Sequence, residues 1–358
     1  MSRTPRVFDP QAVRRPVRAA ALSRRSFLGG TLGLGSALLL AACQNQANQP
    51  STAPSTGKTT SGSSAFPVEI KHKFGTTVVP GAAERIASVG LTEHDAILAL
   101  GMQPVAVTEW FGEFPHATWP WAQDLLESEP EVLSYADGVQ IERVAQLAPD
   151  LILGTNAGLN KGTYNKLSRI APVIAQSGEY TDYFEPWRVQ STAIGKALGK
   201  DPEMQELIAH VDEVYATARK DHPKFEGKNV FLMAPAFYDG SIYVYQEGIS
   251  TEFLTSLGLV FPDVIKEYAT DDANAFIPKE DLADALEVGD VVIWLTTSDE
   301  EQQKLLDDPI IQRLRSTQED HNIFTGLEIG GAVNFSTVLS LPWLADNLVP
   351  QLADVLGS

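Results

Sequence analysis

The sequence predicts an α/β fold of two lobes joined by one long helical segment. In both halves of the chain, short apolar runs bounded by polar turns alternate with amphipathic stretches of helix length, a pattern typical of parallel sheets covered by helices. A predominantly helical stretch at 186–222 separates the halves. With 358 residues and 44% hydrophobic side chains, the chain is long and apolar enough for two domains of ordinary size.

The first 42 residues form a separate, basic part of the chain. They contain seven Arg and one Asp, whereas the remaining 316 residues carry a formal net charge of −25. Arg24 and Arg25 stand directly before an uncharged, Gly-rich apolar run at 26–42, which is typical of a twin-arginine export signal. The run is too short and too rich in Gly for a membrane span. We therefore expect residues 1–42 to be a removable leader.

The only cysteine, Cys43, directly follows this apolar run in the sequence LAAC, which resembles the bacterial lipoprotein box. A single Cys excludes internal disulfides and thiolate-rich zinc sites. A buried free thiol is the alternative, but no core is expected where an apolar leader meets the polar, Ser- and Thr-rich segment 44–65. We expect Cys43 to carry lipid, 43–65 to be a flexible tether, and the protein to be anchored to the outer face of the cell membrane.

Residues 66–185 are predicted to form the first lobe. Alternating segments on either side of Gly75 indicate a hairpin at its edge. Strands are expected at 85–90, 104–108 and 150–154, helices at 92–101 and 140–149, and a shorter helix and strand at 164–174. This order of elements predicts a parallel sheet whose strands end at one shared edge.

The connecting helix is expected at 186–222 and the second lobe at 223–358. The sequence GKDP at 199–202 should break or kink the helix, because Pro lacks a backbone donor. In the second lobe the strands are expected at 229–235, 241–246, 291–297 and 322–326, with a helix at 250–258 and a terminal helix from about 336 to 356. A ligand of such a protein would bind between the lobes, beyond the carboxyl ends of the strands.

Three of the six tryptophans, Trp110, Trp119 and Trp121, lie in the loop that follows strand 104–108. Such side chains can cover an organic ligand with apolar surface and ring faces. For Trp121, a core position is an equal alternative. Further candidate ligand-binding residues follow predicted strands or begin the connecting helix: Asn156, Tyr183, Arg188, Tyr238, Tyr243, Trp294 and Asn334. Arg188 is the expected partner of an anionic ligand, although a solvated helix residue is an alternative.

Composition and motifs exclude several classes of function. The acidic body argues against nucleic acid, which requires a basic face. The six His residues are scattered without HxH or HxxxH pairs, so no metal site is expected. The chain has no GxSxG elbow, no P-loop and no GxGxxG after a strand, and its paired acids lie in polar stretches. We therefore expect a protein that is not an enzyme and has no resident cofactor.

Several phrases occur in an order that resembles a known family. They are RIASVGLTEHDAILALGMQPVAVT, the PWA at 120–122, IERVAQLAPDLILG, STEFLTSLGL and LSLPWLADNLVPQL. The chain from 66 to 356 is similar to the iron-siderophore substrate-binding lipoproteins of ABC importers, a cluster that also contains vitamin B12 and haem binders. The resemblance implies the class III substrate-binding architecture, a monomer, and delivery of a ferric siderophore to a permease dimer with its ATPase. Haem or cobalamin binding is an alternative, as is a sensory or adhesion lipoprotein without a transport role.

The resemblance also implies two docking residues, and the charge of the chain indicates a class of ligand. Each lobe in the family carries a surface Glu on its first helix that pairs with Arg on the permease, and the matching positions here are Glu93 and Glu252. Both are expected in a first helical turn, where the helix dipole favours an anion for stability alone. Because basic residues are few, a hydroxamate or mixed ferric chelate of low charge fits better than an anionic tris-catecholate.

Overall fold

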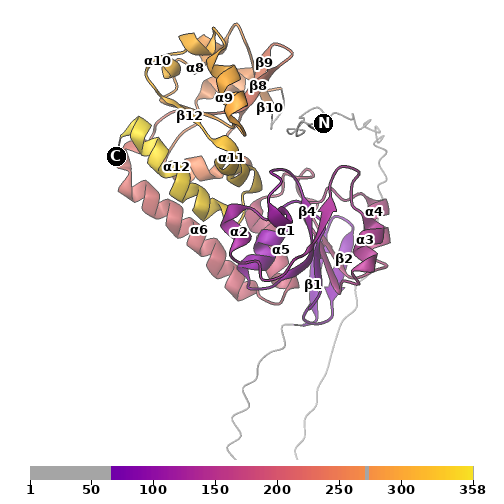
Figure 1. Cartoon of the computed structure of the whole chain (residues 1–358). Helices are drawn as coiled ribbons and strands as arrows, with labels where there is room; N and C mark the ends of the chain where they lie inside the picture. The colour runs from indigo at the N-terminus through magenta and orange to yellow at the C-terminus, as the bar shows by residue number, and fades with distance from the viewer. Residues whose placement is uncertain (1–65, 271–273, 358) are drawn as a thin grey trace, which may run out of the picture. The chain divides into compact units, whose positions relative to one another are not determined.

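The computed structural model of the chain describes residues 66–270 and 274–357 (Figure 1). The predictions for the leader, the tether and Cys43 lie outside these residues. Within them, the two α/β lobes and the helical connection are present, so the predicted fold class is confirmed. No helix of the described part is both long enough and apolar enough to cross a membrane.

The first lobe is built on a five-stranded parallel sheet with the strand order β5-β4-β3-β6-β7. Its central strand β3 is buried along its whole length, as is β6 beside it, which explains their uninterrupted apolar sequences. The elements of this lobe are β1 (Val68–His72), β2 (Gly75–Val79), β3 (Ile86–Ser88), α1 (Glu93–Ala99), β4 (Pro104–Glu109), η2 (Pro115–Ala117), α2 (Pro120–Gln123), β5 (Glu131–Ser134), α3 (Ile141–Gln146), β6 (Leu151–Gly154), α4 (Lys161–Leu167) and β7 (Val173–Ala175).

The connection consists of two helices, α5 (Trp187–Ala197) and α6 (Asp201–Asp221). The chain leaves the helical path between them, at the GKDP sequence where the break was predicted, and Pro202 then occupies the first turn of α6. Helix α5 packs against α1, β1 and β7 of the first lobe, whereas α6 packs against α5, α7 and α12.

The second lobe has a mixed sheet with the order β10-β9-β8-β11-β12. Strands β8, β11 and β12 are parallel, but β9 is antiparallel to both β8 and β10, because the short turn at Asp239 and Gly240 folds the chain directly back. The elements are η3 (Pro223–Phe225), β8 (Val230–Tyr238), β9 (Ser241–Tyr245), η4 (Ile249–Thr251), α7 (Glu252–Ser256), η5 (Asp263–Tyr268), β10 (Asn274–Pro278), α8 (Leu282–Leu286), β11 (Val291–Trp294), α9 (Asp299–Leu306), η6 (Ile311–Arg313), α10 (Arg315–Gln318), β12 (Asn322–Phe324), α11 (Gly326–Phe335) and α12 (Ser340–Leu356).

One apolar core runs through both lobes. It includes Ile70 of the first hairpin, Leu232 of β8 and Leu352 near the end of the chain, joined through buried side chains of α5, α6 and α12. Helix α12 lies along α6 (Figure 1), where Tyr215 of α6 donates a hydrogen bond to the backbone oxygen of Leu341 at 2.9 Å. The terminal helix was predicted from about 336, but it starts at Ser340. The reason is that Ser336 adopts a left-handed conformation, which ends α11 before α12 begins.

Candidate functional site

The carboxyl edge of the first sheet carries a pocket of about 300 Å³, which we call the tyrosine pocket. It lies where β3, β4, β5 and β6 end, at the point where the strand order reverses direction, which is the usual ligand position in an open α/β sheet. Its lining consists of Val89, Thr108, Leu133, Ser134, Tyr135, Ala136, Gly138, Val139, Gln140, Ala157, Gly158, Leu159, Asn160, Thr163 and Tyr183. None of these side chains is charged, so the pocket offers hydroxyls, amides and two phenols.

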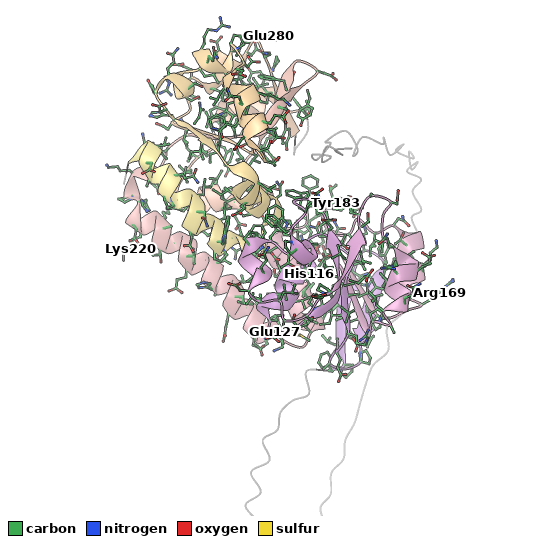
Figure 2. All side chains as sticks on the ribbon, in the orientation of Figure 1. His116, Glu127, Arg169, Tyr183, Lys220 and Glu280 are labelled. Carbon is green, nitrogen blue, oxygen red and sulfur yellow. The ribbon has the colours of Figure 1, made fainter. Side chains whose placement is uncertain are left out.

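Two phenols meet at the rim of this pocket. The hydroxyl of Tyr135 donates to that of Tyr183 across 3.0 Å, and the exposed fractions of the two residues are 39% and 38%. Figure 2 shows Tyr183 at the end of the first lobe where these strands terminate. Burial and the neighbouring Tyr135 raise the pKa of Tyr183, so its phenol is neutral at physiological pH. Tyr183 was predicted at the site, and Tyr135 was not.

The start of helix α1 is buried beside the tyrosine pocket. Glu93 is only 1% exposed, and its carboxylate accepts the backbone N–H of Asn156 at 2.6 Å and that of Thr92 at 3.2 Å. The hydroxyl of Thr155 also donates to it at 3.2 Å. Burial raises the pKa of Glu93, and these hydrogen bonds oppose the rise. Glu93 thus ties α1 to the loop after β6, and the expectation that it lies on the surface is wrong.

The next two residues of α1 are also fully buried. Asp95 accepts hydrogen bonds from the indole of Trp121 at 2.8 Å and from the hydroxyl of Thr337 at 2.6 Å. Burial raises the pKa of Asp95 to about 7 and lowers that of His94 to about 4. The side chains of His94 and Asp95 come within 3.7 Å of each other. With these shifted pKa values, both side chains are neutral between about pH 4 and 7, so they do not form an ion pair.

The aromatic loop after β4 packs against the second lobe. We call this cluster the aromatic junction: Trp110, Phe111, Phe114, Trp119, Trp121, Phe335 and Trp343. Trp119 is 1% exposed and stacks on Trp121 with ring centroids 5.0 Å apart. A Cβ atom on Gly331 of α11 would lie 2.0 Å from its ring, so only glycine permits this approach. Trp119 is therefore a packing residue, and its prediction as a ligand contact is wrong.

Trp110 and Trp121 remain partly exposed at this junction. The ring of Trp110 lies 5.6 Å from that of Phe335, and Trp110 stays a predicted ligand contact. The ring centroids of Trp121 and Trp343 of α12 lie 5.6 Å apart, and the indole N–H of Trp121 donates a hydrogen bond to Asp95. For Trp121 the structure favours the alternative of a core position.

The second-lobe candidates are divided between surface and core. Tyr238 ends β8 and is half-buried, and Tyr243 of β9 contacts the rings of Tyr245 and Phe276 at 4.7 and 5.4 Å. Asn334 is exposed on α11. Trp294 is 0% exposed and donates its indole N–H to Asn322 at 3.0 Å. Its prediction as a ligand contact is wrong, because β11 is a central strand with both faces covered.

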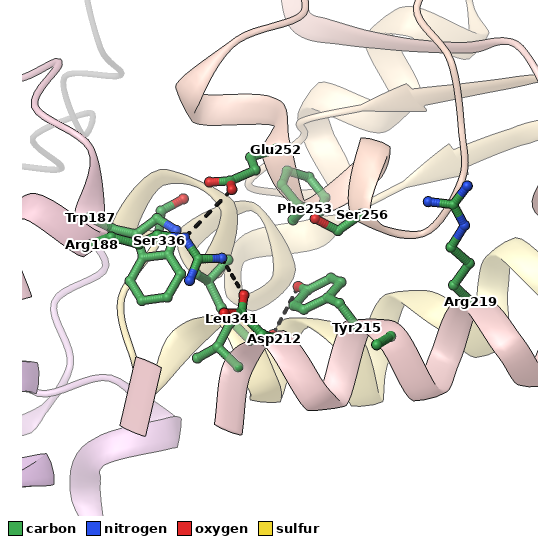
Figure 3. A pocket seen from close by; sticks show the side chains of 12 residues that line it. Trp187, Arg188, Asp212, Tyr215, Arg219, Glu252, Phe253, Ser256, Ser336 and Leu341 are labelled. Carbon is green, nitrogen blue, oxygen red and sulfur yellow. Dashed lines mark hydrogen bonds and ion pairs between the residues drawn. The ribbon is translucent and has the colours of Figure 1, made fainter. Parts of the chain in front are cut away.

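Arg188 lines a second pocket, of about 250 Å³, between helices α5, α6 and α7 (Figure 3). Its guanidinium contacts Asp212 at 2.5 Å and Glu252 at 3.5 Å and lies over the ring of Trp187 at 4.3 Å. Two carboxylates from different elements thus already pair with this cation. The structure does not bring Arg188 to the tyrosine pocket, whose lining it does not share.

The predicted symmetry of Glu93 and Glu252 is also wrong. Helix α1 connects strands β3 and β4, whereas α7 follows the antiparallel strand β9 and so starts at the opposite edge of its sheet. Glu252 is accessible, with 45% of its side chain exposed, but it faces Arg188. Helices α1 and α7 therefore have similar sequences but occupy different positions in their lobes.

The two lobes do have a matching pair of helices, α3 and α8. Each leads from the outermost strand on one side of its sheet to the fourth strand in the order, from β5 to β6 and from β10 to β11. Glu142 and Glu280 are exposed, and each stands two residues before the first buried apolar side chain of its helix, Val144 or Leu282. The signal for this pair is present in the sequence, as IERVAQL and KEDLADAL.

Among residues 66–270 and 274–357, no group of three or more His, Cys, Asp or Glu side chains could hold a metal ion. Asn156 has its side-chain amide on the hydroxyl of Thr92 at 3.1 Å and is mostly buried, so it positions α1 next to the tyrosine pocket. The structure thus brings Asn156, Tyr183 and the newly recognised Tyr135 to one edge, and it leaves Trp110 at the junction with the second lobe.

Comparisons with known proteins agree with this architecture. The chain is 45% identical to a periplasmic solute binding protein of Mycobacterium smegmatis of known structure, with a TM-score of 0.75 over 81% of this chain and 99% of that one. It is 26% identical to PiaA of Streptococcus pneumoniae in complex with ferrichrome, with a TM-score of 0.67 over 80% of this chain and 98% of that one. It is also 26% identical to the Fe(3+) dicitrate-binding periplasmic protein FecB of Escherichia coli, over 72% of this chain and 81% of FecB.

The first two curated relatives match over only about half of their own length, 46% and 56%. The model of the periplasmic binding protein family, however, matches residues 86–326, which include both sheets and the two connecting helices. That family consists of binding proteins and is not a class of enzymes. The chain therefore belongs to the periplasmic binding protein family, which confirms the resemblance found in its sequence.

Proposed function

We propose that this protein captures a ferric siderophore and delivers it to the permease and ATPase of an ABC importer. One observation carries the proposal: two proteins with a named ligand that match over most of their own length bind ferric chelates, FecB with Fe(3+) dicitrate and PiaA with ferrichrome. The tyrosine pocket and the partly exposed Trp110 supply neutral polar groups and ring surface for such a ligand. In this proposal the iron is cargo and the protein has no resident cofactor.

The ligand should be a ferric chelate of low net charge. No charged side chain lines the tyrosine pocket, and the guanidinium of Arg188 is paired with two carboxylates. An anionic tris-catecholate would have to give up its hydration there without a compensating cation, which is costly. A hydroxamate or mixed chelate of low net charge loses less hydration on entering the pocket and therefore does not need a compensating cation.

Binding of a ferric hydroxamate should quench the tryptophan fluorescence, because Trp110 is within reach of a ligand at the edge of the first lobe. At a ligand concentration of 100 times Kd, the gain of about 2.7 kcal/mol should raise Tm by about 5 °C or more. The iron-free hydroxamate is the control, and catecholates, haem and cobalamin complete the panel. If no ferric chelate quenches the fluorescence or raises Tm, the proposed function is wrong.

We further propose that the permease recognises Glu142 and Glu280, one in each lobe. Both carboxylates are exposed, and the topology gives their helices the same position in the two sheets. Because β10 runs parallel to β8, both helices start at the carboxyl edge of their sheet, the edge that also carries the tyrosine pocket in the first lobe. Glu93 is too buried for this role in this conformation, and Glu252 would first have to leave Arg188.

Replacing both glutamates, Glu142→Ala and Glu280→Ala, should reduce uptake of the ferric chelate by a reconstituted importer. A lost hydrogen bond to a charged group is worth about 1.5–3 kcal/mol, so we expect a loss of tenfold or more for each residue. The Kd for the chelate, measured by fluorescence, should not change. A Glu252→Ala variant is the comparison, and loss of uptake in that variant alone would contradict the assignment.

We also propose that the protein is exported by the twin-arginine route and anchored through lipid on Cys43. The support is the sequence alone: Arg24 and Arg25 before a short apolar run, and LAAC at its end. Multiple acyl chains would hold the folded body to the membrane, because each buried CH₂ contributes about 0.8 kcal/mol. Mass spectrometry of the membrane-extracted protein would detect these chains on Cys43, and an unmodified thiol there would refute the anchor.

A further inference from the structure

One phenol of the tyrosine pocket, that of Tyr183, is held in place by costly local structure. Tyr183 has a φ of 71°, in the left-handed region that a bulky residue rarely adopts. A Cβ atom on Gly158 would lie 2.1 Å from the Tyr183 hydroxyl, so the phenol occupies space that only glycine leaves free. Strained backbone of this kind costs on the order of 1–3 kcal/mol and is concentrated at functional sites.

The separation of the two oxygens suits a metal-bound pair. In octahedral coordination with metal–oxygen bonds of about 2.0–2.1 Å, adjacent oxygens lie about 2.8–3.0 Å apart. The hydroxyls of Tyr135 and Tyr183 are 3.0 Å apart, and both residues are more than one-third exposed at the rim of the pocket. Phenolate oxygen is a known ligand of ferric iron, for example in the haem site of catalase.

Two phenols are too few to hold a bare ion. The described part of the chain has no cluster of His, Cys, Asp or Glu to complete a coordination sphere, and no charged side chain lines the pocket. Any iron that reaches the phenols must therefore arrive already wrapped in an organic ligand. That ligand must also leave two neighbouring positions on the metal open or occupied by water.

We propose that Tyr135 and Tyr183 bind directly to the iron of a ferric chelate of low net charge that fills only four of the six positions of the metal. The inference rests on the proposed function and specifies its ligand class. In the binding step, two water molecules leave the iron, each phenol forms an oxygen–iron bond, and the two phenol protons pass to solvent. The iron remains ferric throughout.

The proton balance gives the step a pH dependence. Each oxygen–iron bond forms at the expense of a phenol O–H bond, so binding of the iron to the two hydroxyls releases protons. Affinity for such a chelate should therefore rise with pH. A chelate that fills all six positions has no proton to displace and should bind with little pH dependence. No charged side chain lines the pocket that contains the pair. Two acidic residues act on Tyr183 from outside the lining: Asp182, which is ion-paired with Lys73, and the buried Glu93, whose carboxylate accepts hydrogen bonds from Thr155 and Asn156.

The test uses two ferric hydroxamates that differ in the number of donor groups. The first probe is the 1:1 ferric complex of the tetradentate dihydroxamate rhodotorulic acid, and the second is the hexadentate complex ferrioxamine B. With the first probe we expect a phenolate-to-iron charge-transfer band and tyrosinate ring modes in the resonance Raman spectrum. With the second probe, neither signal should appear.

Conservative variants assign the signals to residues. Tyr135→Phe and Tyr183→Phe should each change the charge-transfer band and weaken binding of the first probe by about tenfold or more, with unchanged Tm. Tyr180→Phe, in the same loop but outside the pocket lining, is the matched control and should keep both. Binding of the first probe without tyrosinate modes would overturn the inference and leave the proposed function intact. Failure of every ferric chelate to quench the fluorescence would overturn both.

Discussion

A Trp119→Ala variant should lose about 3–5 kcal/mol of the free energy of unfolding, the range for removal of a large buried aromatic side chain. Trp119 is 1% exposed and contacts the rings of Phe111, Phe114, Trp121 and Phe335. Its removal would leave a cavity between the loop after β4 and Gly331 of α11, which the surrounding rings cannot fill without moving. Chemical denaturation monitored by far-UV circular dichroism measures the loss.

The control for this prediction is Trp110→Ala, in the same loop. Trp110 is partly exposed and contacts only Phe111 and Phe335 among the described rings, so its loss should cost markedly less stability. Ligand affinity should show the opposite order: Trp110→Ala should weaken binding more than Trp119→Ala, because Trp110 is partly exposed and Trp119 is buried. A Trp119→Ala protein as stable as the wild type would show that this ring is not part of the core.

The second large effect is a pH dependence that Asp95 confers on stability. Burial raises the pKa of this carboxyl in the folded protein to about 7, whereas in the unfolded chain it titrates near 3.8. Between these values the folded state binds the extra proton, so the free energy of unfolding falls as the pH rises. Relative to an Asp95→Asn variant, the wild type should lose roughly 4 kcal/mol from about pH 4 to 7.

The comparison between the wild type and Asp95→Asn separates the contribution of Asp95 to the pH dependence of stability from those of its neighbours. Burial lowers the pKa of His94 to about 4, which produces the opposite trend, since the unfolded chain then binds the extra proton. Glu93, whose pKa is raised, acts in the same direction as Asp95. Both contributions are present in the wild type and the variant. Glu142→Gln, on the exposed face of α3, should show no such difference, and a pH-independent difference for Asp95→Asn would refute the buried neutral carboxyl.

The sequence was sufficient for the overall architecture because apolar periodicity directly reports burial. The strands β3, β6 and β11 are buried along their whole length, and each was expected from an uninterrupted apolar run. The strand β9 was expected at 241–246, but its antiparallel direction was not, since an apolar run does not reveal the direction of a strand. The turn at Asp239 and Gly240 was the available signal for that reversal.

Individual site residues were harder to predict, because exposure depends on contacts between distant segments. Trp119 and Trp294 follow or end strands as expected for ligand contacts, but Gly331 and Asn322 cover them. Glu93 stands in a first helical turn like a surface residue, yet the loop at Asn156 encloses it. Tyr135 was missed because its partner Tyr183 lies 48 residues further along the chain.

The core that joins Ile70 to Leu352 has a consequence for the order of events during synthesis. The first lobe emerges from the ribosome long before α12, but the apolar surface shared by α6 and α12 cannot close until the last helix has been made. Contacts between residues so distant in sequence make folding slow. Completion of the native structure should therefore be a late event, and until then the half-built core is exposed to aggregation. An export route that carries finished proteins, as we propose for this leader, would place that interval entirely inside the cell.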